Sequence, residues 1–137
     1  MAVRAKQLRY AVDLAATGEL REEGGGVLDV PAAWSPEHLL LAALVRCSLK
    51  SLRYHAGRKG IDVRSASGSG RTLVTKRETD DRYALVETDV ELVVELEPEP
   101  DALPELLALG ERDCFVGSSL TAKPRYRWIV NSRTIDS

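Results

Sequence analysis

The chain has 137 residues, which corresponds to one domain at roughly 100–200 residues per domain. Its 19 basic and 21 acidic side chains give a formal net charge of −2, and 44% of its residues are hydrophobic. This composition excludes a disordered chain and disfavours a general nucleic-acid binder, which carries a strong basic excess. No apolar run approaches the ~18 residues needed to cross a membrane. No secretory signal is readable, so we expect a cytoplasmic protein without membrane insertion.

The first elements expected are two strands that form an N-terminal hairpin. Residues 7–16 mix apolar and polar positions and predict the first strand. Residues 17–26 include three consecutive glycines and predict a turn, because glycine adopts positive φ at little cost. Residues 27–30 predict the short partner strand.

A long helix from residue 36 is the clearest expectation. Ser35 is a good N-cap, Pro36 suits the first helical position, and Glu37 complements the positive end of the helix. Nothing breaks the helical pattern before about Arg58. Residues 39–45 are apolar on every side, which predicts burial all round. A helix of this length spans roughly 33 Å, so we expect a central helix against which the rest of the chain packs.

The second half of the chain is expected to contain mainly strands. Alternating residues predict the strands, and proline and glycine mark their ends. The expected elements are two strands over 61–67 and 71–77 joined by a turn at 68–70, a long strand over 82–97, a helix capped by Asp101 and ending near Cys114, a strand over 123–130 and a flexible tail over 131–137.

Several kinds of site are disfavoured by residue spacing. His38 and His55 lie far apart on the expected helix, so we expect surface or capping roles and no metal site. The glycine segment 68–70 is expected to join two strands, which does not fit a dinucleotide site. The basic, aromatic segment 123–128 could stack on bases, but the net charge ranks nucleic-acid binding last.

The two cysteines, Cys47 and Cys114, remain as candidate reactive groups. The cytosol keeps thiols reduced, so a structural disulfide is not expected. Lys50 and Ser51 share the helix face of Cys47, and a nearby cation lowers the pKa of a thiol. Free cysteine is also among the most buried residue types, so a purely structural role stays open for each.

The segment from Trp34 to Cys47 resembles the Ser/Asn-Pro-Glu helix, with its cysteine, of the OsmC/Ohr family of osmotically inducible and organic hydroperoxide resistance proteins. The ten-residue offset from Glu37 to Cys47 agrees with that family, as does a second cysteine, Cys114, after a leucine-rich helix. The resemblance implies an α+β fold of one domain over 1–137, with antiparallel sheets wrapped around a long central helix. It also implies an intertwined homodimer with its sites at the subunit interface.

The resemblance further implies a thiol peroxidase that needs no metal, flavin or haem. In this interpretation Cys47 attacks an organic or lipid hydroperoxide and becomes a sulfenic acid, which condenses with Cys114 to a disulfide. A dithiol reductant, such as a dihydrolipoamide-bearing protein, then restores both thiols. The alternative is a non-enzymatic dimer of the same fold that binds a small apolar ligand at its interface.

Two further residues are candidates for assisting Cys47. Ten residues of helix rise about 15 Å, so Glu37 cannot touch Cys47 of its own chain if the helix is continuous. We expect it to act at the partner's site or through an arginine, or else only to stabilise the first helical turn. Arg21 is the nearest match to the arginine of the family, and Arg9 is second. The family commonly has proline directly after the second cysteine, whereas this chain has Phe115.

Overall fold

The computed structural model describes residues 5–135, which divide after Pro36 into an N-terminal unit and a larger C-terminal unit. The N-terminal unit is a three-stranded antiparallel sheet of β1 (Val12–Leu14), β2 (Leu20–Glu22) and β3 (Val27–Leu28). The predicted single turn over 17–26 is wrong, because it contains β2. Gly18 and Gly25 adopt φ of 92° and 93° and so allow a separate tight turn on either side of that strand.

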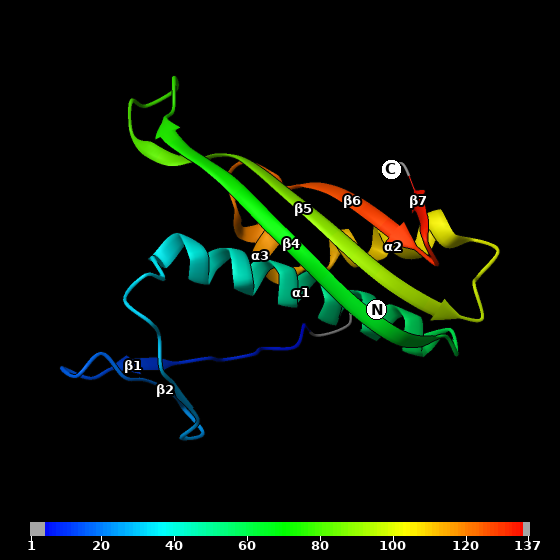
Figure 1. The fold of residues 1–137 in the computed structure, drawn as a ribbon, viewed down its shortest axis with the longest axis horizontal. Helices are drawn as coiled ribbons and strands as arrows, with labels where there is room; N and C mark the ends of the chain where they lie inside the picture. Colours follow the sequence, from blue (N-terminus) through cyan, green and yellow to red (C-terminus); the bar gives the residue numbers. More distant parts are fainter. Residues whose placement is uncertain (1–4, 136–137) are drawn as a thin grey trace. The chain divides into compact units, whose positions relative to one another are not determined.

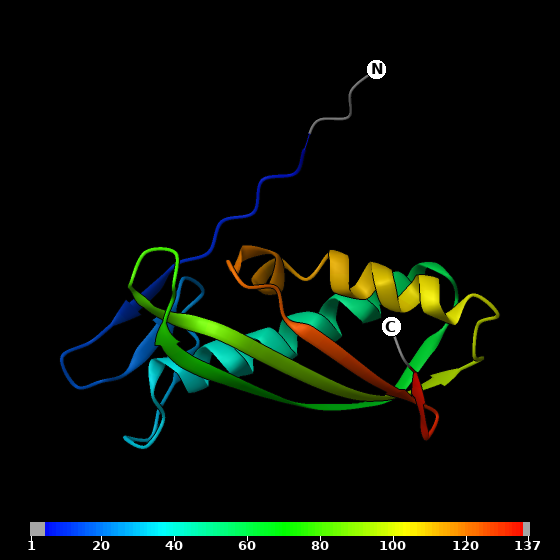
Figure 2. The same cartoon turned by 90° about the horizontal axis from the view of Figure 1, so that it is seen from above.

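The described residues of the C-terminal unit form three helices and four strands, which makes it an α+β unit. All three helices lie on the same face of the sheet (Figure 1, Figure 2). Among the described residues, no helix is long and apolar enough to cross a membrane. The elements are α1 (Pro36–Arg58), β4 (Asp62–Lys76), β5 (Tyr83–Glu97), α2 (Leu103–Arg112), α3 (Phe115–Ser119), β6 (Arg125–Val130) and β7 (Arg133–Ile135).

Helix α1 has the predicted bounds, but its apolar half is not buried all round. Leu44, Ser48, Leu52 and Ala56 are fully buried and recur at four-residue spacing, so they form one buried stripe, in which Leu52 packs near Gly110 of α2 and Leu44 near Gly117 of α3. The side chains of residues 39–42 are only half-buried in the single chain. The prediction of complete burial is therefore wrong for the chain by itself.

Strand β4 is continuous through the glycine segment that was predicted to be a hairpin turn. A Cβ atom on Gly68 would lie 2.9 Å from Leu92 Cδ2 and 3.0 Å from Val45 Cγ1 of α1. A Cβ atom on Gly70 would lie 3.4 Å from Cδ2 of Leu41, one turn earlier on α1. These glycines therefore allow close packing of helix against strand, which is a known role of glycine inside a strand.

The sheet has the strand order β4-β5-β6-β7. The β4–β5 pair is antiparallel, as expected of the predicted antiparallel sheets, and β7, which was not predicted, pairs antiparallel with β6. Strands β5 and β6 are parallel. Parallel neighbours require a crossover connection, and α2 and α3 form it. The N-cap of α2 is Ala102 and not the predicted Asp101, and α3 was not predicted.

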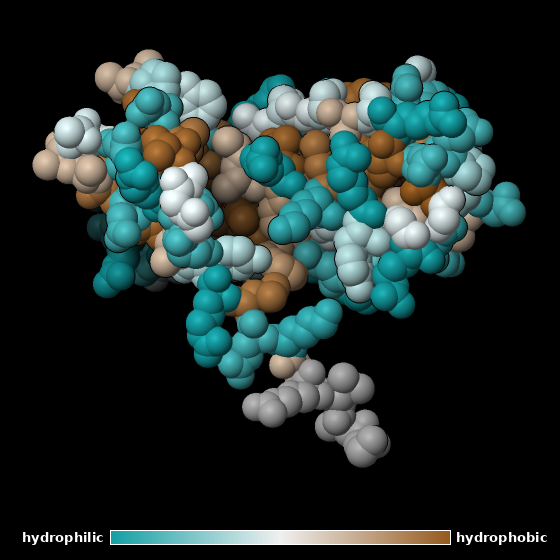
Figure 3. Space-filling view, turned by 90° about the horizontal axis from the view of Figure 1, so that it is seen from below, coloured by the Kyte–Doolittle hydropathy of each residue, from teal (hydrophilic) through white to brown (hydrophobic). Residues whose placement is uncertain are grey.

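The core lies between this sheet and the helices. Strand β5 alternates as predicted, with Val90, Leu92, Val94 and Leu96 buried on one face. Trp128 of β6 is fully buried, and its indole nitrogen donates to a carboxylate oxygen of Glu111, in α2, at 2.9 Å. Hydrophobic side chains also reach the molecular surface among hydrophilic ones (Figure 3).

The predicted flexible tail is wrong for residues 131–135. Asn131 and Ser132 adopt φ of 50° and 68° and form the turn into β7. The Asn131 side chain accepts from the Leu96 backbone nitrogen at 2.9 Å and donates to its oxygen at 3.2 Å. These bonds, together with the tolerance of asparagine for left-handed backbone, specify the turn. Residues 136 and 137 lie outside the described residues.

Candidate active site

Both cysteine sulfurs contact the same short segment, the first turn of α3. Cys47, in the middle of α1, accepts a hydrogen bond through Sγ from the backbone nitrogen of Val116 at 3.5 Å. Cys114 is the N-cap of α3, and its Sγ accepts from the backbone nitrogen of Gly117 at 3.4 Å. Both are free thiols. A single helical turn therefore provides a backbone donor to each sulfur.

Cys114 lies in a small buried polar cluster. Its thiol and the Ser48 side chain are fully buried, and Ser48 Oγ lies 3.5 Å from Cys114 Sγ. The Ser48 hydroxyl donates to the Leu44 carbonyl oxygen at 2.8 Å and lies 3.5 Å from Tyr126 Oη. Burial is the main cause that raises the pKa of Tyr126, so its hydroxyl stays protonated near neutral pH.

The environment of Cys47 favours the protonated thiol. Burial raises the pKa of Cys47, the Val116 N–H opposes that rise, and the neighbouring Cys114 thiol adds to it. Lys50, which was expected to lower this pKa, has an exposed side chain and is not among the main influences on the thiol, whose pKa is raised. The prediction of activation by Lys50 is therefore wrong. Within the described residues of one chain, the donors to the Cys47 thiol are backbone N–H groups.

Glu37 does not reach Cys47 within the chain, and Arg21 and Arg9 belong to the N-terminal unit. Helix α1 is unbroken between Glu37 and Cys47, so about 15 Å of helical rise separates them. Arg21 lies on β2, is exposed, and pairs with Glu19 at 2.8 Å. Arg9 is also exposed and donates to the Gln7 side chain at 3.1 Å. The structure thus brings the two cysteines together and leaves Glu37 away from them.

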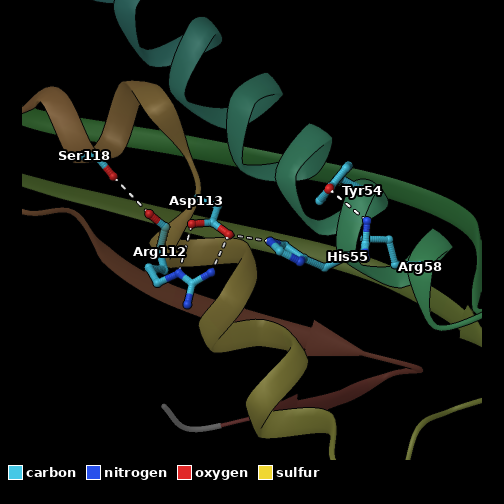
Figure 4. A network of polar contacts seen from close by, with 6 residues as sticks. All are labelled: Tyr54, His55, Arg58, Arg112, Asp113 and Ser118. Atoms are coloured by element: carbon cyan, nitrogen blue, oxygen red, sulfur yellow. Dashed lines mark hydrogen bonds and ion pairs between the residues drawn. The ribbon is translucent and has the colours of Figure 1, made fainter. Parts of the chain in front are cut away.

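A polar side-chain contact that sequence reasoning missed links α1 to the segment carrying Cys114 (Figure 4). The side chain of His55, for which a surface or capping role was expected, is only 11% exposed, and its Nε2 lies 2.7 Å from Oδ2 of Asp113. Arg112 donates to both oxygens of the same carboxylate, each at 2.9 Å. The hydrogen bonds from Arg112, and to a smaller extent the one with His55, hold the pKa of the Asp113 carboxyl below its usual value. No local pattern signals this contact, because the partners are 58 residues apart.

Neither base stacking nor metal binding has support in the described part of the chain. Trp128 is fully buried and therefore cannot stack on a nucleobase. Arg125 forms a two-point ion pair with Asp89, and Arg127 lies 3.7 Å from a carboxylate oxygen of Glu91. Residues 5–135 contain no group of three or more His, Cys, Asp or Glu side chains placed to hold a metal ion.

Comparison with known proteins gives the family. A family model described as "OsmC-like protein" matches residues 28–128, so the chain belongs to the OsmC-like protein family. Among solved structures, an OsmC-like protein of unknown function from Vibrio cholerae superposes with a TM-score of 0.72 at 14% identity, covering 90% of this chain and 100% of that one. An OsmC-like protein from Mycoplasma pneumoniae superposes with a TM-score of 0.68 at 16% identity, and the match covers 93% of this chain and 99% of that one.

An organic hydroperoxide resistance protein from Elizabethkingia anophelis, with thiocyanate bound, also has a similar fold. Its TM-score is 0.64 at 12% identity, and the match covers 93% of this chain and 98% of that one. No curated protein matches the sequence. At these identities the structural likeness establishes a shared fold.

Proposed function

We propose that this protein is a cysteine-based peroxidase that reduces organic or lipid hydroperoxides to alcohols. The observation that carries the proposal is the convergence of Cys47 and Cys114 on the first turn of α3, where each thiol accepts a backbone hydrogen bond. Similarity in fold to proteins named organic hydroperoxide resistance proteins supports the substrate class.

The proposed reaction begins at Cys47. Its thiolate attacks the distal oxygen of the hydroperoxide, the O–O bond breaks, and the departing alkoxide takes a proton to give the alcohol. Cys47 is thereby oxidised to a sulfenic acid. The Cys114 sulfur then attacks the Cys47 sulfur, and the sulfenic oxygen leaves as water with the thiol proton. The N–H group of Val116 stabilises the thiolate form of Cys47 before the attack.

The protein works as a homodimer in this proposal. The apolar residues 39–42 of α1 are half-buried in one chain, and a second subunit would remove more of their surface from water. Glu37 cannot reach Cys47 along its own helix, so it assists the site of the partner subunit. Arg21, with Arg9 as the second candidate, supplies the positive charge that favours the Cys47 thiolate. An external dithiol, such as a dihydrolipoamide-bearing protein, restores both thiols in the cytoplasm.

The proposal is tested by treating reduced protein with cumene hydroperoxide and measuring its intact mass. The expected result is the loss of two hydrogen atoms in the wild type and no such change in Cys47→Ser. Cys114→Ser should instead accumulate a sulfenic acid that dimedone traps. Thiols that stay unchanged in excess peroxide would overturn the proposal.

The second candidate function is binding of a small apolar ligand without catalysis. It is favoured by the raised pKa of Cys47, because a protonated thiol is a poor nucleophile. Undiminished ligand binding in a Cys47→Ala, Cys114→Ala double variant, together with no turnover of peroxide, would support this function over the first.

A further inference from the structure

The Ser48 hydroxyl makes three polar contacts inside the core. Its oxygen lies 2.8 Å from the Leu44 carbonyl oxygen, 3.5 Å from Cys114 Sγ and 3.5 Å from Tyr126 Oη. Ser48 and Cys114 are fully buried, so bulk water does not reach either group. A hydroxyl has one hydrogen to donate and two lone pairs that accept, and it turns to suit its neighbours. Ser48 is therefore able to act as acceptor or as donor toward the Cys114 sulfur.

In the reduced protein Ser48 is the acceptor. Its single hydrogen is donated to the Leu44 carbonyl oxygen, which is the shortest of the three contacts. The hydrogen between Ser48 Oγ and Cys114 Sγ is therefore the hydrogen of the thiol. The Gly117 N–H donates to the same sulfur at 3.4 Å. The Cys114 thiol is thus held between one acceptor and one donor.

The Tyr126 hydroxyl adjoins the Cys114 sulfur because Gly117 has no side chain. A Cβ atom on Gly117 would lie 2.8 Å from Tyr126 Oη and 3.5 Å from Cys114 Sγ. The φ of Gly117 is outside the left-handed range, so its backbone conformation does not require glycine. Burial first, and also the neighbouring Cys114, raise the pKa of Tyr126, so its hydroxyl keeps the hydrogen that it donates.

We propose that the hydroxyls of Ser48 and Tyr126 stabilise the thiolate of Cys114 in the step that forms the disulfide. This inference rests on the proposed function, because it requires a sulfenic acid on Cys47. A fully buried thiolate has no water to bond to, and hydrogen bonds from the protein then favour the charged form. Ser48 provides one by turning its hydrogen from the Leu44 carbonyl to the sulfur, while that carbonyl keeps the backbone bond of α1.

The step balances in atoms and electrons. The Cys114 sulfur loses its proton, and its electron pair forms the bond to the Cys47 sulfur. The S–O bond of the sulfenic acid breaks, and its electron pair goes to the oxygen, which takes up the proton and leaves as water. Cys114 is oxidised and the sulfenic sulfur is reduced, both to the level of the disulfide. The two hydroxyls change the direction of their hydrogen bonds and keep their protons.

The test follows the two chemical steps separately. Reduced protein is mixed with one equivalent of cumene hydroperoxide and quenched rapidly with acid at successive times, and its intact mass is measured. Oxidation of Cys47 adds one oxygen atom, and formation of the disulfide then removes one molecule of water. We expect Ser48→Ala to slow the loss of water by about tenfold, the worth of one hydrogen bond to a charged group, and to leave the gain of oxygen at the wild-type rate.

Tyr126→Phe is an independent variant on β6 that should slow the same step, so the loss of one fold leaves the other variant to decide. Ser51→Ala is the matched control, because Ser51 is also a buried serine of α1 and its Oγ has no hydrogen-bond partner within residues 5–135. This control should match the wild type in both steps. A wild-type rate of water loss in either test variant, or equal slowing in Ser51→Ala, would overturn this inference alone. A wild type whose Cys47 gains no oxygen would overturn the proposed function as well.

Discussion

Nε2 of His55 lies 2.7 Å from Oδ2 of Asp113, the residue that directly precedes Cys114 (Figure 4). This pair joins the last turns of α1 to the junction of α2 and α3. The Ser118 hydroxyl closes the junction from the other side by donating to the Arg112 carbonyl oxygen at 3.1 Å. The contacts fix the turn that carries Cys114 and the donor to Cys47.

The first prediction concerns the stability that this pair provides. Asp113→Asn should lower the free energy of unfolding by about 1 kcal/mol, because the carboxylate is partly exposed and solvent screens the pair. Urea denaturation followed by circular dichroism measures the change. Asp80→Asn, which breaks an exposed pair with Arg77 at the β4–β5 turn, is the control and should have a smaller effect. Equal losses in the two variants would contradict the prediction.

The pH dependence of stability follows from the lowered pKa of Asp113. A carboxyl group with a lower pKa in the folded state stabilises the fold above its unfolded pKa, which is about 3.9 for aspartate. That contribution is lost as the pH falls through the folded pKa. The wild type should therefore lose more stability than Asp113→Asn when urea denaturation is repeated from pH 6 down to pH 3. Parallel curves for the two proteins would show that Asp113 contributes nothing to the acid dependence.

The third prediction concerns the backbone donor to Cys47. Val116→Pro removes the N–H that bonds to Cys47 Sγ, and proline is tolerated in the first turn of a helix. The pKa of Cys47 should rise further, because that bond is the largest influence that lowers it. The rate of alkylation by iodoacetamide as a function of pH, followed by mass spectrometry, measures this. Val116→Ala keeps the N–H and should match the wild type; the same shift in both would assign the effect to the side chain.

The fourth prediction concerns the packing of α1 on β4. Gly68→Ala should destabilise the protein by about 1–3 kcal/mol, because its Cβ would lie 2.9 Å from the Glu91 backbone oxygen, which cannot yield as a side chain does. A Cβ atom on Gly57 of α1 would have no atom within 4 Å, so Gly57→Ala should stabilise the protein by about 0.5–1 kcal/mol. Urea midpoints of the two variants should therefore move in opposite directions. A neutral Gly68→Ala would mean that helix and strand are less closely packed than described.

Helix α1 and strand β5 could be predicted from the sequence because their signals are local. The proline at position 36 and the alternation of Val90 to Leu96 each act within a few residues. The continuity of β4 could not be predicted. Gly68 allows close packing against Val45 of α1, but in the sequence alone it is typical of a turn. The turn into β7 likewise depends on bonds from Asn131 to Leu96, which are distant in sequence.

The candidate site was predictable as a pair of thiols but not in its surroundings. The motif around Cys47 and the late Cys114 stand in the sequence. The donors that face them are backbone N–H groups of Val116 and Gly117, and every residue except proline has such a group. Which of them meets a sulfur depends on α3, and its five residues are too few for a periodic pattern. The prediction that Lys50 places a positive charge beside Cys47 was wrong, because a long side chain at a helix surface extends into solvent.

The first turn of α3 is held partly by the sulfur atoms that it contacts. Two of its amide hydrogens, on Val116 and Gly117, have thiol sulfurs as their acceptors. Any chemistry that changes those sulfurs also changes the acceptors of these amides. The exchange of two backbone hydrogens with solvent therefore reports the oxidation state of the protein, so that a nuclear magnetic resonance spectrum could follow it without a probe on either cysteine.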